Sequence, residues 1–349
     1  MNPLRKAFRD YSLLSVVLLL FLYSCRNEGG IDDFFSFSDF ETRSVSLDDV
    51  EYSPSVLDRF SSSLQLMGNS VFILSPRSAD KLVTRFDFET GEKETLVPRG
   101  RGPGEVLGVG DLCVENNDLI IYDTNERKLL KFVLSTDGSP HYDSSLLLSI
   151  FYHRIIPIPR SGYLGLPMTD GRFCLIDSDG KPKESFGSFL PVKGSCEALN
   201  NMALQTLVAF SPDGNHMCSA YQNADCIEFY DSFRLTQRLI GPERRIPGVT
   251  KWQEGDRYGY TFSPMYKEYM GICGKEEGVY VGYVGYERKK GDPDRCINSI
   301  LFFDWEGNPK VRYLLPFELD AFDIDSCNRV TGVTFDHEHP QLVRFKLPD

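Results

Sequence analysis

The amino-acid sequence predicts an all-β fold built from repeated units, and three observations lead to this prediction. From about Phe40 onward, short runs rich in Val, Ile, Phe and Tyr alternate with turns rich in Gly, Asp, Asn and Pro. No long stretch of the sequence shows sustained helical periodicity. One type of strand recurs six times, at intervals of 44 to 63 residues. Six units of about four short strands are typical of a six-bladed β-propeller, in which the blades surround a channel.

The recurring strand is the second strand of each predicted blade, and a tight turn precedes each copy. Its copies are Val71–Leu74, Leu119–Tyr122, Tyr163–Leu166, His216–Ala220, Val279–Tyr283 and Val330–Thr334. A third strand follows each copy, at Leu82–Phe88, Leu129–Leu134, Phe173–Asp177, Ile227–Tyr230, Ile300–Asp304 and Leu342–Phe345. A β-sandwich or two smaller β domains is the alternative, and the regularity of the units favours the propeller.

The two ends of the repeat region complement each other. The sixth unit ends at Asp349 with only three strands, and the segment Phe40–Asp49 is an unpaired strand candidate. We therefore expect Phe40–Asp49 to supply the outer strand of the last blade. Closing the ring in this way removes an open sheet edge, which is otherwise an aggregation hazard. Residues 40–349 are thus predicted to form one propeller domain.

The N-terminus has the pattern of an export signal. Basic residues (Arg5, Lys6, Arg9) precede the nearly apolar segment Tyr11–Tyr23. This segment is short for a membrane span, which needs about 20 apolar residues. The segment ends in Leu22-Tyr23-Ser24-Cys25, which resembles a bacterial lipobox. That resemblance implies cleavage before Cys25 and a diacylglyceryl group on its thiol. An ordinary signal peptide, or an anchor helix with a chance Cys, is the alternative.

Processing at Cys25 would divide the chain into three parts. Residues 1–24 would be the signal peptide, residues 25–39 the lipidated Cys and a tether, and residues 40–349 the propeller. The net charge of −12 would become −14 on the mature chain. Such an acidic balance argues against a nucleic-acid or anionic-lipid partner, so the lipid rather than charge would hold the protein at a membrane.

The nine cysteines are interpreted mainly as small buried side chains. Apart from Cys25, most of them lie among apolar residues of predicted strands, and no C-x-x-C motif occurs. Export would permit disulfides. One bridge therefore remains possible, and the sequence does not assign it.

One segment carries a resemblance to a known family. Arg99–Glu105 reads Arg-Gly-Arg-Gly-Pro-Gly-Glu, and Asp111–Asp123 and Lys128–Phe132 follow it. Together they resemble the six-bladed β-propeller lipoproteins of gut-type Gram-negative bacteria, the TolB-like or NHL-like proteins. The resemblance implies a propeller fold and an outer membrane lipoprotein, on the periplasmic side or at the cell surface. It implies no catalytic residue.

The long connections are predicted to share one face of the propeller. In a four-stranded blade, the second-to-third loops and the blade-to-blade connections lie on the same face. Nearly every long segment is of these two kinds: Pro98–Gly110, Gly187–Gln205, Gly241–Lys267 and Tyr286–Arg295. Long loops on a rigid scaffold are where binding usually occurs, so we expect the functional face here, at one mouth of the channel.

Two groups on these loops are candidate ligand-binding residues. Arg99 and Arg101 could clamp a carboxylate or phosphate beside Glu105. The alternative, which we favour, is a structural crossover in which these charges pair with neighbours. Aromatic residues of the longest insertion suit glycan or peptide recognition: Trp252, Tyr258, Tyr260 and Tyr266. The alternative for these rings is that they pack the insertion onto its blade, which we favour.

No catalytic or metal site is predicted. Asp336–Pro340 (Asp-His-Glu-His-Pro) is interpreted as a solvated turn, because two further fixed ligands are not evident. The first functional hypothesis is a binding or scaffolding module without a cofactor, whose partner is an envelope protein, peptide or glycan. The second is a lactonase-type propeller hydrolase with Ca²⁺ held by carboxylates and Asn in the channel. Asp residues recur near strand ends and could serve it: Asp87, Asp111, Asp123, Asp177, Asp231, Asp304 and Asp323.

Overall fold

The computed structural model describes most of the chain after the N-terminal segment. The described ranges are 32–53, 63–76, 78–115, 117–135, 138–168, 171–194, 197–255, 257–289, 291–334 and 340–349. They contain many β-strands, one α-helix and two short 3-10 helices. The predicted signal peptide and Cys25 lie outside these ranges. Of the described elements, no helix has the length and apolar character that spanning a bilayer requires.

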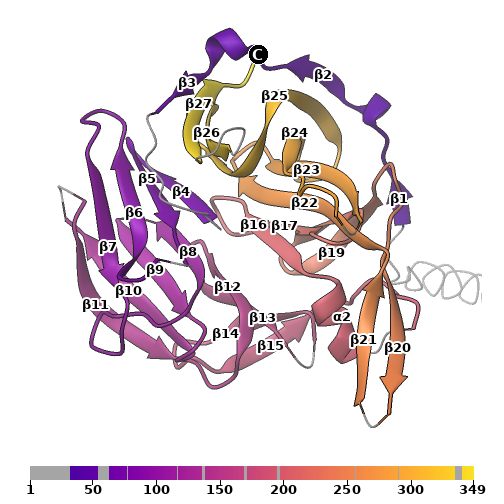
Figure 1. Cartoon of the computed structure of the whole chain (residues 1–349), viewed down its shortest axis with the longest axis horizontal. Coiled ribbons are helices and arrows are strands. Elements are labelled where there is room, and N and C mark those ends of the chain that lie inside the picture. Colours follow the sequence, from indigo (N-terminus) through magenta and orange to yellow (C-terminus); the bar gives the residue numbers. More distant parts are fainter. Residues whose placement is uncertain are drawn as a thin grey trace, which may run out of the picture.

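Four blades are antiparallel meanders, in which each strand pairs with the next along the chain (Figure 1). Blade I contains β4 (Ser63–Met67), β5 (Ser70–Leu74), β6 (Lys81–Asp87) and β7 (Lys93–Pro98). Blade II contains β8 (Val109–Glu115), β9 (Asp118–Asp123), β10 (Lys128–Leu134) and β11 (Pro140–Leu147). Blade III contains β12 (Tyr152–Ile158), β13 (Gly162–Pro167), β14 (Phe173–Ile176) and β15 (Pro182–Phe186). Blade IV contains β16 (Thr206–Phe210), β17 (His216–Tyr221), β18 (Cys226–Asp231) and β19 (Arg234–Ile240).

The last two blades share one long strand, β25 (Pro309–Ile324). Its first half pairs with β24 up to Leu314 and, after an irregularity, again at Leu319, and its second half pairs with β26 from Leu319 onward. Blade V therefore contains β22 (Met265–Gly274), β23 (Val279–Arg288), β24 (Ile297–Phe303) and the first half of β25. Blade VI contains the second half of β25, β26 (Arg329–Thr334), β27 (Gln341–Lys346) and β3 (Glu51–Tyr52).

The six first strands form a closed ring. Neighbouring members of the series β4, β8, β12, β16, β22 and the second half of β25 contact each other, and β25 returns to β4. The colours of Figure 1 run once around this ring from blade I to blade VI. The six-bladed propeller predicted from the repeats is confirmed.

The N-terminal residues 32–52 form a strap around the outside of blades IV to VI. β1 (Asp32–Phe34) adds to β19 in parallel, β2 (Glu41–Ser44) adds to β25 in parallel, and β3 pairs antiparallel with β27. The 3-10 helices η1 (Phe37–Asp39) and η2 (Leu47–Asp49) separate these strands. In Figure 1 the strap is the indigo segment along the rim.

Two boundary predictions were wrong, because a strand-like pattern does not reveal its partner. An N-terminal strand closes the last blade as predicted, but this strand is β3 and not the segment Phe40–Asp49, whose strand β2 covers blade V. The fold also begins before the predicted end of the tether at residue 39. Phe35 is buried, and its ring lies edge-on to Phe303 with centroids 5.5 Å apart, so burial of apolar surface holds this part of the strap in place.

The long connections leave the sheets on one face, as expected from the meander topology. The β7–β8 connection, the β15–β16 connection with α2 (Glu197–Ala203), the β19–β22 connection and the β23–β24 loop all belong to it. The β19–β22 connection contains a separate hairpin of β20 (Gly248–Glu254) and β21 (Arg257–Ser263). We call this the long-loop face.

The described cysteines follow the interpretation from sequence. Seven are free thiols, and Cys174, Cys218, Cys226 and Cys273 among them are buried.

Candidate functional site

The channel of the propeller contains a cavity of about 580 Å³. Residues of all six first strands line it, including Gln65, Asp111, His153, Val208, Met270 and Asp320. Its loop residues are Thr124, Asn125, Phe151 and Gln222, and each of them belongs to a connection of the long-loop face. The cavity therefore opens on that face, and we call this opening the channel mouth.

A charge pair spans two blades at the channel mouth. Arg154 of β12 donates from Nε and Nη2 to Oδ1 of Asp111 on β8, at 2.9 and 2.7 Å. The other carboxylate oxygen of Asp111 accepts the backbone N–H of Ile155 at 3.0 Å. The pair joins blades II and III, and the Arg154 side chain remains 26% exposed toward solvent. It therefore offers a fixed polar contact at the wall of the cavity.

Burial keeps two other titratable side chains of the cavity neutral. Burial and the nearby Arg154 hold the pKa of His153 below its usual value, so its imidazole is uncharged at pH 7. Burial raises the pKa of the Cys113 thiol to about 12, with nearby carboxylates adding to the rise. A protonated thiol is a poor nucleophile, so Cys113 has no sign of activation.

Six of the seven Asp residues proposed for Ca²⁺ accept backbone N–H groups, and Asp111 is the one already described. Asp87, Asp177 and Asp304 accept backbone N–H groups within the turns that follow their strands. Asp123 accepts from Leu107, and Asp323 accepts from Leu66. Within the described ranges, no three His, Cys, Asp or Glu side chains are grouped so that they could hold a metal ion. Asp336–His339 lie outside those ranges. The part of the chain that the structure describes thus provides no ligand set for the hydrolase hypothesis.

The Arg99–Glu105 element lies in the β7–β8 connection. The guanidinium of Arg99 donates to the carbonyl oxygens of Pro76, Ser78 and Leu107, at 2.7 to 3.1 Å. Glu105 accepts the backbone N–H of Gly102 at 2.7 Å. Arg99 and Glu105 therefore bind protein backbone within blade I and its crossover.

Arg101 and Arg99 have different partners. Its side chain is 80% exposed, and its Nε lies 3.8 Å from Oε1 of Glu126. The structure does not bring the two arginines together as a clamp. Arg101 is the most exposed charged residue of this element, and among the described residues only an exposed ion pair with Glu126 would compete with a ligand on the long-loop face.

The predicted aromatic residues lie on the hairpin or at its foot. Trp252 of β20 and Tyr260 of β21 are 44% and 42% exposed, and the pairing register places them on opposite faces of the hairpin. Trp252 lies opposite Gly259, which has no side chain to hold the ring away. Tyr266 is the second residue of β22, and Cζ of Arg245 lies over its ring, 5.9 Å from the centroid. Tyr258 belongs to β21, but its side chain lies outside the described parts.

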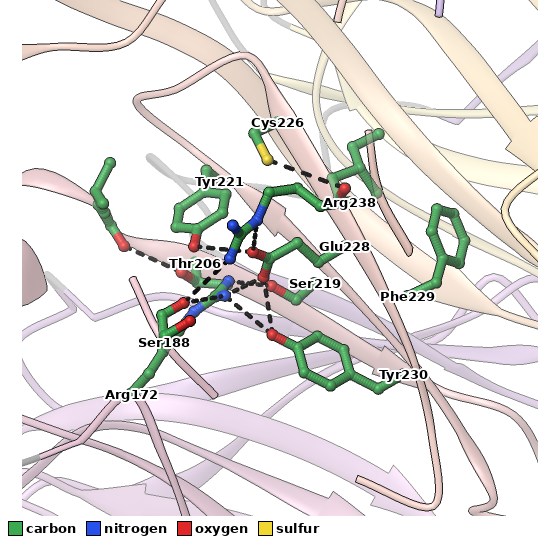
Figure 2. A network of polar contacts seen from close by, with 12 residues as sticks. Arg172, Ser188, Thr206, Ser219, Tyr221, Cys226, Glu228, Phe229, Tyr230 and Arg238 are labelled. Atoms are coloured by element: carbon green, nitrogen blue, oxygen red, sulfur yellow. Dashed lines mark hydrogen bonds and ion pairs between the residues drawn. The ribbon is translucent and has the colours of Figure 1, made fainter. Parts of the chain in front are cut away.

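A buried ionic network lies between blades III and IV (Figure 2). Glu228 on β18 accepts from Arg172 and, at 2.6 Å, from Nε of Arg238. Tyr230 donates its hydroxyl to Glu228 at 2.9 Å, and Arg172 also donates to Ser219 at 2.6 Å. The Phe173 and Tyr221 rings flank the Arg172 guanidinium, with centroids 4.5 and 4.3 Å from Cζ. One carboxylate thus compensates two buried cations, with help from the ring faces.

This network is hydrogen-bonded to one connection of the long-loop face. Arg172 precedes β14 of blade III, whereas Glu228 and Arg238 belong to blade IV. Both arginines also donate to the carbonyl of Ser188, at the start of the long β15–β16 connection. Sequence reasoning missed all three charged residues. The available signal was a Glu in the middle of the otherwise apolar strand Cys226–Tyr230.

Another buried carboxyl group belongs to β22, the strand that follows the hairpin. Glu268 of β22 has no exposed surface; its Oε1 accepts from Arg245 at 3.3 Å, and its Oε2 has no partner. Burial raises the pKa of Glu268 to about 8; nearby Asp225 adds to the rise, and Arg245 opposes it. Asp225 itself accepts from the hydroxyl of Tyr269 at 2.7 Å.

Glu268→Gln should stabilise the protein at alkaline pH. The unfolded carboxyl loses its proton near pH 4.5, whereas the folded one keeps it until about pH 8. The free energy of unfolding therefore falls as pH rises through this window, and Gln removes that loss. We expect Glu268→Gln to gain about 2–4 kcal/mol at pH 8.5 and little at pH 4.5. Urea unfolding at both pH values measures this.

Glu243→Gln is the matched control, because Glu243 is the half-exposed second partner of Arg245. Its effect should be small and nearly independent of pH. A loss of stability in Glu268→Gln that is equal at both pH values would contradict the assignment of a raised pKa.

Comparisons with known proteins agree with this architecture. A family model described as "TolB-like 6-blade propeller-like" matches residues 65–327. A solved protein of Bacteroides fragilis, described as exported, is 14% identical with a TM-score of 0.53, over 90% of this chain and 100% of that chain. A member of the duf4221 family from Bacteroides vulgatus is 10% identical with a TM-score of 0.47, over 86% of this chain and 98% of that chain. No curated protein sequence matches the chain. At such low identity the structural likeness shows the fold alone.

Proposed function

The chain belongs to the TolB-like six-blade propeller-like family, and on that premise we propose that it is a non-enzymatic binding module of the cell envelope. A propeller supports many unrelated functions, so the proposal depends on the site and not on the fold. The ligand would be a peptide or glycan segment, free or part of an envelope protein, that enters the channel mouth from the long-loop face.

The observation that carries this proposal is the cavity at the channel mouth. Its volume of about 580 Å³ lies in the range of pockets that hold small molecules or chain segments. Its wall combines apolar side chains such as Val208 and Met270 with polar groups such as Asn125, Gln222 and Arg154. Peptides and glycans need this combination, because they present both apolar surface and many hydrogen-bonding groups.

The proposed location depends on the N-terminal sequence. The basic region, the apolar segment and Ser24-Cys25 support export and attachment of lipid to Cys25. We therefore propose an outer membrane lipoprotein, on the periplasmic side or at the surface. Several acyl chains on one residue would anchor it firmly despite its acidic charge.

Photo-crosslinking in cells tests the binding face without knowledge of the ligand. A benzophenone amino acid in place of Asn125, which is exposed at the channel mouth, should form covalent adducts with the ligand. The same amino acid in place of Glu92, exposed in a turn of the opposite face, should form several-fold fewer. Gel shifts would reveal protein adducts, and mass spectrometry would reveal peptide or glycan adducts. Equal adducts at both positions, or adducts at Glu92 alone, would contradict a binding role for the long-loop face.

A further inference from the structure

Several large apolar side chains are exposed where the strap meets the hairpin. We call these residues the rim patch: Phe34, Met202, Ile246, Trp252, Tyr260 and Met265. Their exposed fractions range from 36% to 52%. They come from β1, α2, the β19–β20 connection, the two hairpin strands and the start of β22. Figure 1 shows β1, α2 and the hairpin on the same side of the propeller.

Direct contacts join these elements. Phe34 pairs with Ile240 at the end of β19, and the guanidinium of Arg244 lies over the Phe34 ring at 4.4 Å. At the foot of the hairpin, Val249 donates its N–H to the carbonyl of Lys193 at 2.9 Å. Val249 is buried with Leu199 of α2, and Phe262 packs against the same cluster. The elements that carry the rim patch therefore pack against one another at the foot of the hairpin, and Trp252 and Tyr260 project from its two opposite faces.

The hairpin holds its aromatic residues away from the core. Its foot is fixed by Val249 and Phe262, but every residue from Thr250 to Glu254 is exposed. Among the described strands, β20 and β21 pair only with each other, and Figure 1 shows the hairpin extending beyond the ring of blades. Trp252 and Tyr260 thus contribute little to folding, and their exposure has a cost that a contact with an apolar surface would remove.

The length of the tether determines what can reach this surface. This step rests on the proposed function, in which Cys25 carries the acyl chains. Six residues separate Cys25 from Asp32, the first residue of β1, so the seven Cα–Cα steps between them span at most about 25 Å when fully extended. The acyl anchor therefore keeps the rim patch beside the lipid surface at high effective concentration.

We propose that the rim patch contacts the headgroup region of the membrane and orients the propeller on it. Trp and Tyr favour this region, because each has an apolar ring and a hydrogen-bonding tip. Phe34, Ile246 and the two Met side chains would enter the boundary between headgroups and acyl chains. The patch combines projecting side chains from separate elements, which suits a soft and continuous surface. The partner is thus a bilayer rich in zwitterionic lipid, since the acidic chain would be repelled by anionic lipid.

The two tryptophans make the test selective. Trp252 belongs to the rim patch, whereas Trp305 is 8% exposed and donates to the carbonyl of Lys275 in blade V. The lipidated chain is reconstituted into phosphatidylcholine vesicles with or without bromine on the acyl chains, which quenches nearby indole rings. In Trp305→Phe, the emission of Trp252 should lie at a shorter wavelength on vesicles than in water. Bromine on the acyl chains should then quench most of this emission. In Trp252→Phe, the emission of Trp305 should not change.

Acylation of Cys25 and membrane contact of the rim patch are measured separately. Mass spectrometry of the N-terminal peptide shows whether Cys25 is acylated. If it is acylated and Trp252 is neither quenched nor shifted, the inference is wrong, the anchor stands and a protein partner becomes the occupant of the rim patch. If it is not acylated, the anchor fails. A His-tag in front of Cys25 on nickel-chelating vesicles then replaces the tether, and the same quenching of Trp252 decides the inference independently.

Discussion

Replacing Glu228 by Gln is expected to destabilise the folded protein by about 3–5 kcal/mol. Glu228 is the carboxylate that compensates Arg172 and Arg238 in the buried network between blades III and IV (Figure 2). Gln keeps the size of the side chain and part of its hydrogen bonding but removes the charge. Two guanidinium groups would then lie in the interior without an anion, and removal of one partner from a buried ion pair is strongly destabilising.

Chemical denaturation at pH 7 measures this effect as a lower midpoint with an unchanged slope. Glu184→Gln is the matched control, because Glu184 is exposed on β15, the outer strand of blade III. Its effect should remain within about 0.5 kcal/mol. If Glu228→Gln also remains within that range, the network does not hold the two blades together.

Glu228→Gln should also affect the β15–β16 connection. Arg172 and Arg238 both donate to the carbonyl of Ser188, so loss of Glu228 should loosen the β15–β16 connection along with the blade interface. Hydrogen exchange of residues 187–194 would report this loosening. Faster exchange there without a change in blade I would show that the network supports the long-loop face locally.

Cys25→Ala is expected to release the protein from the membrane completely. Each buried methylene of an acyl chain contributes about 0.8 kcal/mol, and several chains on one residue make dissociation negligible. Without the thiol no acyl group can attach, and contact of the rim patch with lipid is far too weak to replace several acyl chains. Metabolic labelling with palmitate and partitioning into detergent should both be lost.

Cys327→Ala serves as the control, because Cys327 is an exposed free thiol on the propeller. Its labelling and partitioning should match those of the unchanged protein. Persistence of both signals in Cys25→Ala would refute the lipoprotein assignment and, with it, the proposed location.

The blades were predictable because their strands carry local signals. The predicted strand Val71–Leu74 corresponds to β5 (Ser70–Leu74), and His216–Ala220 corresponds to β17 (His216–Tyr221). Apolar runs between turn residues mark such strands whatever their neighbours are. The strap was placed incorrectly because Phe40–Asp49 could have added to any open edge, and the choice depends on which blade offers a pocket for Phe40 and Val45.

The candidate site was predictable only in outline. Topology alone assigned the long loops to one face, and the structure agrees. The sequence did not show whether Arg99 meets a ligand or backbone, because that depends on the carbonyl groups of Pro76 and Ser78. Nor did it pair Asp111 with Arg154, which lie 43 residues apart on neighbouring blades.

The sequence by itself determined the six-fold repeat, the all-β fold and the expected N-terminal processing, because each depends on residues that are close together along the chain. The tertiary structure decided the path of the strap, the pairing of Glu228 with Arg172 and Arg238, and the wall of the channel mouth. Burial and charge pairing act between residues that are distant in sequence, and their energies depend on distance and exposure. Only the closed ring of blades brings these residues together.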